Sequence, residues 1–138
     1  MGSALILETT FLVDLERELR RGRAGPAHKL LEGHDEDQLY VTFTIAGELA
    51  CGASLSARER WEAFLAPFHV LPVTPEVCWQ YGRVYRYLQD NGRLIGANDL
   101  WIAATALAND MPVVTRNEEH FRRVPGLVVV GYRKPGHS

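Results

Sequence analysis

Two kinds of segment alternate along the chain, one marked by short apolar runs and the other by apolar residues at helical spacing. The short runs lie at residues 4–7, 39–43, 68–73, 113–115 and 127–130, and their apolar, β-branched and aromatic content predicts strands. Helical spacing predicts helices at residues 9–22, 26–32, 44–51, 56–66, 74–90 and 98–108, and a helical turn at 118–122. This alternation predicts an α/β fold, with a central parallel sheet of four to five strands and helices on both faces.

The helix at residues 98–108 is the most apolar segment of the chain. Beyond Asn98 and Asp99 it is apolar on nearly every face, which indicates a helix buried in the interior. Residues 109–112 end it, and residues 113–115 predict a short, fully buried strand. Asp99 therefore lies in the first turn of an interior helix, where a carboxylate needs a cation or a set of hydrogen bonds. This makes Asp99 the first candidate for a functional residue.

Composition narrows the possible classes of protein. The chain has 138 residues, which predicts a single domain over residues 1–138. Its formal net charge is -2, so bulk charge predicts neither a nucleic-acid binder nor a membrane binder, and any RNA contact has to come from a local patch. No apolar run reaches membrane-spanning length, so we expect a cytoplasmic protein without membrane contact. Cys51 and Cys78 have apolar neighbours and are expected to be reduced thiols in the core.

Acidic and amide side chains gather near one predicted edge of the sheet. Glu8 directly follows the first strand, Glu48 lies in the helix after the second, and Asn117 follows the fourth. Ligand sites of open parallel sheets form outside the carboxyl ends of the strands. Asp99 joins this edge if its helix begins there, as a crossover helix after a strand should. We therefore expect all four side chains to line one acidic pocket.

Three carboxylates and one amide make an all-oxygen set of ligands, which suits Mg²⁺ or Mn²⁺ better than zinc. The cysteines and histidines show no spacing typical of a zinc site. A divalent cation held at this edge can lower the pKa of a water molecule and neutralise the charge of a phosphodiester. Without the cation, carboxylates placed this close would repel, and one of them would take up a proton.

Three stretches together resemble VapC-type PIN-domain ribonucleases, the toxins of bacterial toxin–antitoxin pairs. They are LILETTFLVDLE at residues 5–16, TIAGELACGA at residues 44–53 and NDLWIAATALANDMPVVTRNEEHFRRVPGL at residues 98–127. The third is the most specific, because the helix, the strand and the corner at residues 115–117 match together. The resemblance covers nearly the whole chain. It implies a PIN-domain fold, a divalent-metal-dependent endoribonuclease acting on RNA, a homodimer and a VapB-like antitoxin as partner.

Residue by residue, the resemblance implies Glu8 and Asp99 as metal ligands. Glu48 would orient the attacking water or hold a second ion, Asn117 would complete the set, and Thr115 would lie beside the metal ligands. The departure is at Glu8, where members of the family typically carry Asp. This departure predicts an unchanged fold with weakened catalysis. The alternative function is a PIN-domain module that binds its antitoxin without cleaving RNA.

Each candidate also has a simpler structural interpretation. Asp99 could cap its helix, Glu48 could be a solvated carboxylate near the positive end of its helix, and Asn117 could be a turn residue. Thr115 could be a sheet residue with a satisfied hydroxyl, and His120 is most simply structural. The motif that surrounds Asp99 favours metal ligation over capping.

Arginines supply the candidate contacts to RNA phosphates. Arg86, Arg93 and Arg116 are three alternatives. The basic cluster from Arg17 to Arg23 is most simply a solvated helix end, although it could contact RNA phosphates or the antitoxin. The three tryptophans, Trp61, Trp79 and Trp101, are expected in the core or a dimer interface.

A receiver domain with a Mg²⁺-dependent phosphorylation site is a distant alternative from another class of protein. It requires a lysine near the acidic site. The only lysines, Lys29 and Lys134, do not follow predicted strands, which disfavours this class.

Overall fold

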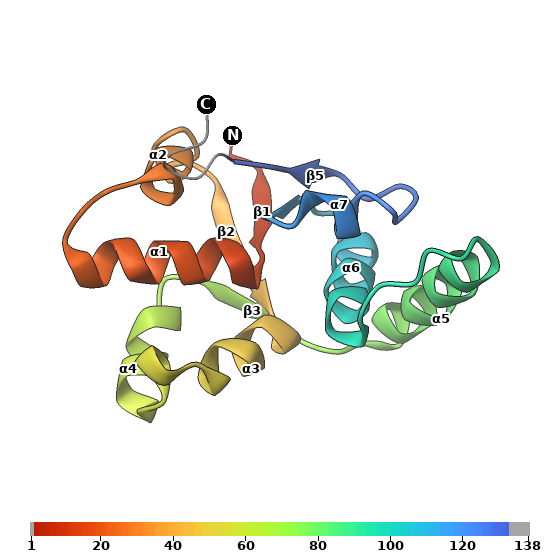
Figure 1. Cartoon of the computed structure of the whole chain (residues 1–138), viewed down its shortest axis with the longest axis horizontal. Helices are drawn as coiled ribbons and strands as arrows, with labels where there is room; N and C mark the ends of the chain where they lie inside the picture. The colour runs from red at the N-terminus through yellow and green to blue at the C-terminus, as the bar shows by residue number, and fades with distance from the viewer. Residues whose placement is uncertain (1, 133–138) are drawn as a thin grey trace.

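The computed structural model describes residues 2–132, which form a parallel sheet with helices on both sides (Figure 1). Its five strands are β1 (Ala4–Leu7), β2 (Gln38–Thr42), β3 (His69–Leu71), β4 (Val113–Val114) and β5 (Val129–Val130), in the spatial order β3-β2-β1-β4-β5. All neighbouring pairs are parallel. The α/β fold predicted from the alternating pattern is confirmed.

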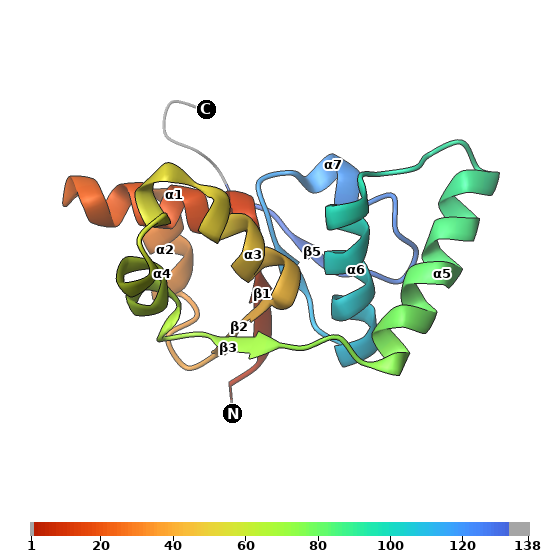
Figure 2. The same ribbon diagram turned by 90° about the horizontal axis from the view of Figure 1, so that it is seen from below.

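The helices cover the sheet in two groups. They are α1 (Thr9–Arg21), α2 (Pro26–Glu32), α3 (Phe43–Cys51), the 3₁₀ turn η1 (Ala53–Leu55), α4 (Arg58–Leu65), α5 (Pro75–Asp90), α6 (Ala97–Asn109) and α7 (Glu118–Phe121). Figures 1 and 2 both show α1 to α4 on one side of the strands and α5 and α6 on the other. None of the helices within residues 2–132 combines the length and apolar character needed to cross a membrane.

The central strand β1 marks the point where the strand order reverses. The chain adds β2 and β3 on one side of β1 and then returns to add β4 and β5 on the other. Ile6 on β1 pairs with Tyr40 on one side and with Val113 on the other. The pairing of β1 with β4 continues beyond the end of β1, because the Glu8 N–H donates to the Val114 carbonyl at 2.9 Å. A crevice beyond the carboxyl ends of β1 and its two neighbours is the usual place for a ligand site in such sheets.

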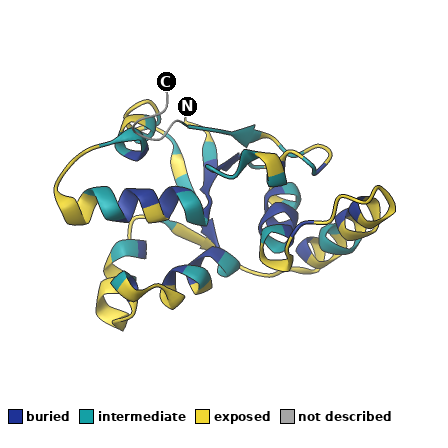
Figure 3. Ribbon diagram, viewed as in Figure 1, coloured by how far each residue is buried: buried dark blue, intermediate teal, exposed yellow. Residues whose placement is uncertain are grey.

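The apolar helix α6 runs through the interior, as its sequence predicts. Its buried residues are Leu100, Ile102, Ala103, Ala104, Thr105 and Ala106. Figure 3 shows buried residues concentrated along α6, β1 and the inward faces of α1 and α3. Small alanine side chains let α6 approach its neighbours closely on several faces at once, which is why the helix tolerates burial. The interior position brings Asp99, in its first turn, to the edge of the core.

The predicted start of one helix is wrong, since the pattern places Thr44 as the cap of the helix at residues 44–51. Thr42, rather than Thr44, caps α3, and its hydroxyl accepts a hydrogen bond from the Ile45 N–H at 3.2 Å. The cap lies earlier because the backbone is still extended at Thr42 and already helical at Phe43, which the predicted strand included. The cap of α5 by Thr74 is confirmed, since its hydroxyl accepts from the Val77 N–H at 3.2 Å. Residues 133–138 of the polar C-terminal segment lie outside the described residues.

The prediction that both cysteines are core thiols is wrong. Cys51 ends α3 and Cys78 lies in α5, and both are exposed. Apolar sequence neighbours did not settle their burial, because successive residues of a helix point in different directions. Trp79 is likewise 62% exposed on α5, so it is not a core residue of this chain.

Candidate active site

Glu8 occupies the carboxyl end of β1, in the position that precedes α1. Its backbone continues the strand, with φ of −79° and ψ of 160°, and its side chain makes no capping hydrogen bond to α1. The residue is only 3% exposed, so its carboxylate is largely removed from bulk water. Burial of this kind requires hydrogen bonds or a cation.

Two threonine hydroxyls hold one oxygen of the Glu8 carboxylate. Thr10 Oγ1 donates to Glu8 Oε1 at 2.7 Å, and Thr115 Oγ1 donates to the same oxygen at 2.6 Å. Backbone groups orient both hydroxyls. The Arg116 N–H donates to Thr10 Oγ1 at 3.0 Å, and the Asn117 N–H donates to Thr115 Oγ1 at 2.9 Å. Both threonine hydroxyls thus hold the Oε1 side of the carboxylate.

Burial raises the pKa of the Glu8 carboxyl above its ordinary value of 4.5. The hydrogen bonds from Thr10 and Thr115 oppose this rise, and the negative charge of Asp99 adds to it. The repulsion from Asp99 means that its carboxylate lies close enough to affect the ionisation of Glu8. A cation between them would relieve the repulsion and favour both ionised forms.

Glu48 reaches the same region from α3, and both of its oxygens have partners. Thr9 Oγ1 donates to Glu48 Oε1 at 2.6 Å, and Asn98 Nδ2 donates to Oε2 at 3.3 Å. Thr9 follows Glu8 and Asn98 precedes Asp99 in the chain. Glu48 is therefore tied to the residues next to the other two carboxylates, in a half-buried position.

Asp99 and Asn117 meet at a histidine. His120 Nδ1 lies 2.9 Å from Asn117 Nδ2 and 3.3 Å from Asp99 Oδ2. A neutral ring nitrogen can accept from the Asn117 amide, and a protonated one can donate to Asp99. Either way His120 links the corner at residues 115–117, which follows β4, to the start of α6. This agrees with the structural role expected for it.

The donor set fits a divalent cation bound mostly through oxygen. In residues 2–132, no group of three or more His, Cys, Asp or Glu side chains lies close enough to form a complete protein cage. Mg²⁺ does not require such a cage, because it is usually held by one or two carboxylates and keeps several waters. Glu8 and Asp99 would supply such a carboxylate pair, since the charge of Asp99 acts on the Glu8 carboxyl.

The three arginines named as phosphate contacts lie in different places. Arg116 Nη1 donates to Asp14 Oδ1 at 3.1 Å, beside the Thr10–Thr115 pair. Arg86 is exposed on α5, with its guanidinium 5.9 Å from the ring of Trp79. Arg93 is exposed in the loop before α6. Of the three, Arg116 alone adjoins the residues around Glu8.

The supporting side chains of Thr9, Thr10 and Asn98 are not among the site residues predicted from the sequence. Thr and Asn are typical residues of helix starts, so their types alone do not mark them as parts of a site. A sequence signal for them exists, since each lies within two residues of Glu8 or Asp99. Most of their partners come from other elements, up to 106 residues away in the chain, and only the folded arrangement identifies them.

Comparison with known proteins identifies the class to which this fold and crevice belong. The family model for the PIN domain matches residues 5–127, so the chain belongs to the PIN domain family. Ribonuclease VapC1 from Haemophilus influenzae strain R2866 is 30% identical over 127 residues, which cover 88% of this chain and 92% of that protein. Within the family the chain is therefore of the VapC type, and the resemblance seen in its sequence is confirmed.

Solved structures agree with this assignment. A chain in the VapBC2 complex from Rickettsia felis, bound to a promoter DNA fragment, matches with a TM-score of 0.79 and 24% identity, covering 94% of this chain and 99% of that chain. A chain of VapBC-1 from nontypeable Haemophilus influenzae matches with a TM-score of 0.72 and 26% identity, covering 93% and 97% of the two chains.

The buried charge of Glu8 leads to a prediction about stability. Glu8→Gln should stabilise the protein in EDTA at neutral pH by about 1–2 kcal/mol, since it removes a buried charge and keeps an oxygen for both threonine donors. A carboxyl whose pKa is raised by folding stabilises the folded state below its unfolded pKa, and this contribution is lost as the pH rises through the folded pKa. The stability difference between the two proteins should therefore grow as the pH rises from about 4 to about 8.

Denaturant unfolding at several pH values measures this difference. Glu62→Gln is the matched control, because Glu62 is an exposed residue of α4. A Glu8→Gln protein whose stability relative to wild type does not change with pH would contradict the assignment of a buried, ionisable Glu8.

Proposed function

We propose that this chain is a divalent-metal-dependent endoribonuclease and the toxin of a VapBC-type toxin–antitoxin pair. The observation that carries the proposal is the buried Glu8 carboxylate at the end of β1, within range of the Asp99 charge, in a VapC-type PIN domain. The relatives named above are a ribonuclease and chains of VapBC complexes. The shared family and fold, together with the carboxylates of Glu8 and Asp99, support the same chemistry here, with RNA as the substrate.

Glu8 and Asp99 would hold Mg²⁺ or Mn²⁺, with Asn117 completing the set of oxygen ligands. When bound, such a cation activates a water molecule and neutralises charge on the phosphodiester. Glu48 would orient the attacking water or help to hold a second ion. Thr10 and Thr115 keep the Glu8 carboxylate in place by donating to its Oε1.

The presence of Glu8 at a position where the family typically has Asp supports a weakened form of this activity. The longer side chain displaces the carboxylate, and the cation has strict geometric demands. The second candidate function is therefore a PIN-domain module that binds its antitoxin and does not cleave RNA. The buried position of Glu8 and its raised pKa favour this second candidate at low metal concentration, since protonation competes with cation binding.

Cleavage of total RNA by the purified chain, with Mg²⁺ or Mn²⁺ and then with excess EDTA, tests the proposal. Metal-dependent, EDTA-sensitive cleavage is the expected result. Absence of cleavage at every metal concentration, in a protein that still binds its antitoxin, would establish the second candidate instead. Cleavage that persists in EDTA would contradict a metal-dependent mechanism.

The partners follow from the same proposal. The antitoxin would be a small VapB-like protein that covers the first helices and blocks the crevice, and co-expression with the neighbouring reading frame should give a co-purifying complex. A homodimer is supported by large side chains exposed on α5, including Trp79, Tyr85 and Tyr87. Analytical ultracentrifugation should show a dimer at micromolar concentration, and a monomer would count against it.

A further inference from the structure

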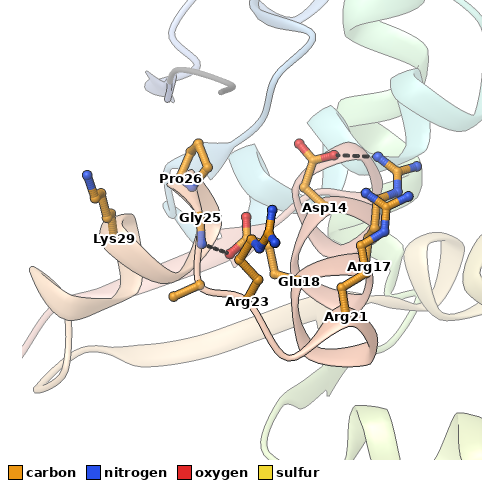
Figure 4. A pocket seen from close by; sticks show the side chains of 9 residues that line it. Asp14, Arg17, Glu18, Arg21, Arg23, Gly25, Pro26 and Lys29 are labelled. Carbon is orange, nitrogen blue, oxygen red and sulfur yellow. Dashed lines mark hydrogen bonds and ion pairs between the residues drawn. The ribbon is translucent and has the colours of Figure 1, made fainter. Parts of the chain in front are cut away.

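A pocket of about 730 Å³ lies at the opposite end of α1 from Glu8 (Figure 4). The last turns of α1, the connection at residues 22–25 and the start of α2 form its walls. Figure 4 shows Arg17 and Arg21 from α1 on one side of the pocket, Lys29 from α2 on the other, and Arg23 between them. Four cationic side chains thus surround one pocket on a chain whose net charge is -2.

The carboxylates of this pocket are already occupied by internal partners. Glu18 accepts from the backbone N–H groups of Gly25, Ala27 and His28 at 2.8, 3.0 and 3.1 Å, and also pairs with the His28 ring. Burial acts to raise the pKa of Glu18, but these hydrogen bonds outweigh it and lower the pKa. The ionised Glu18 therefore joins α2 to α1, and these donors stabilise its negative charge.

Asp14, the other carboxylate of the pocket, is similarly engaged. It accepts from Arg116 Nη1 at 3.1 Å and from the Tyr132 hydroxyl at 2.6 Å, while Arg17 Nη1 lies 3.7 Å away. Among residues 2–132, none of Arg21, Arg23 and Lys29 forms an ion pair. The pocket therefore presents unneutralised positive charge to an external anion.

One face of α1 connects this pocket to the candidate active site. Thr10, Asp14, Arg17 and Arg21 follow one another at helical spacing and lie on the same stripe. Thr10 contacts Glu8 at one end of the stripe, and Arg21 lines the pocket at the other, about 16 Å along the helix axis at about 1.5 Å per residue. Arg116 flanks the stripe between these ends through its contact with Asp14.

We propose that the α1 pocket binds backbone phosphates of the RNA strand, several nucleotides away from the phosphodiester at the active site. This inference rests on the proposed function, because it takes RNA as the substrate. One arginine guanidinium can donate two parallel hydrogen bonds to the oxygens of a phosphate. A row of cationic side chains can bind the backbone of a single strand without recognising its sequence. A chain of net negative charge needs such a local patch to hold a polyanion.

Arg21→Gln/Arg23→Gln tests the pocket directly. Binding of a fluorescein-labelled oligouridine strand is measured by anisotropy in EDTA over a range of salt concentrations, so that cleavage does not interfere. Each phosphate contact to a single strand contributes about 0.7 to the slope of log K against log salt. The double variant should therefore flatten this slope by about 1.4 and weaken binding by about 20-fold at 0.1 M salt.

Arg58→Gln/Arg60→Gln is the matched control, with the same charge change on the exposed surface of α4. Circular dichroism melting checks that both variants are folded. An Arg21/Arg23 variant that binds RNA with the slope and affinity of the control overturns the inference. So does loss of binding to a polyglutamate peptide without loss of RNA binding, since it would assign the pocket to an acidic protein segment.

The two proposals fail separately. If the wild-type chain binds RNA through the pocket and never cleaves it with metal, the proposed enzyme activity fails and the phosphate site stands. If the wild-type chain cleaves RNA and the pocket variant binds normally, the phosphate site fails and the activity stands.

Discussion

Asp99→Asn is expected to lower Mg²⁺-dependent RNA cleavage by about 10³-fold or more while the protein stays folded. The substitution removes one of the two carboxylate charges that would hold the cation, and a loss of about 4 kcal/mol of transition-state stabilisation corresponds to this factor. Asn has nearly the same shape as Asp and is accepted in the first turn of a helix, so α6 should keep its position. Single-turnover cleavage rates across a metal titration measure the effect.

Asp110→Asn is the control for this experiment. Asp110 lies at the other end of α6, in the left-handed conformation with φ of 53°, which Asn also adopts readily. The control carries the same charge change and should cleave RNA at the wild-type rate. If Asp99→Asn also retains the wild-type rate and the wild-type metal dependence, Asp99 does not hold the cation and the proposed site is wrong.

Glu8→Asp is expected to raise the cleavage rate at limiting Mg²⁺ by about 10²-fold. Glu is longer than Asp by one methylene, which moves the carboxylate by about 1.5 Å, and Mg²⁺ accepts ligands only in near-octahedral positions at about 2.0–2.1 Å. A displacement of about 1 Å in a catalytic arrangement can cost on the order of 10²-fold in rate. Thr10 and Thr115 both donate to Glu8 Oε1, which limits how far the longer side chain can turn to compensate.

Two measurements separate a metal effect from a general change in the protein. Mg²⁺ should raise the melting temperature of the Glu8→Asp variant more than that of the wild type, because a better site binds the folded state more tightly. Glu48→Asp, which shortens a different carboxylate by the same methylene, should not produce this gain. If the wild-type protein already cleaves RNA as fast as the Glu8→Asp variant at low Mg²⁺ concentration, the length of the Glu8 side chain does not limit catalysis.

The candidate site carries a stability cost, which hydrogen bonds from the surrounding residues partly offset. Glu8 is buried, its pKa is raised and Asp99 repels it, yet two threonine hydroxyls keep it in place. A hydrophobic or neutral side chain would be less costly at this position in the absence of a cation. The hydrogen bonds that orient Thr10 and Thr115 come from the backbone of residues 116 and 117, so the β4 corner serves as the support of the site.

The sequence by itself determined the order of strands and helices, the parallel sheet and the burial of α6. These features depend on the local period of apolar residues, which can be read directly from the sequence. The same pattern located Glu8 at the end of β1 and Asp99 at the start of α6, because a crossover helix that leads into a parallel strand begins at the carboxyl edge of the sheet. Three motif stretches then indicated the VapC-type PIN family, which the comparisons confirm.

Only the tertiary structure decided which side chains meet. Thr10, Thr115 and Glu8 come together because β1 and β4 are neighbours in the sheet, although 107 residues separate Glu8 from Thr115 in the chain. The exposure of Cys51 and Cys78 depends on which face of a helix packs inward, which apolar neighbours in sequence do not specify. The pocket at the end of α1 likewise depends on a tertiary contact, because the hydrogen bonds from Gly25 and Ala27 to Glu18 hold the start of α2 beside α1. Local periodicity determines elements, but contacts between distant elements depend on the packing of the whole chain.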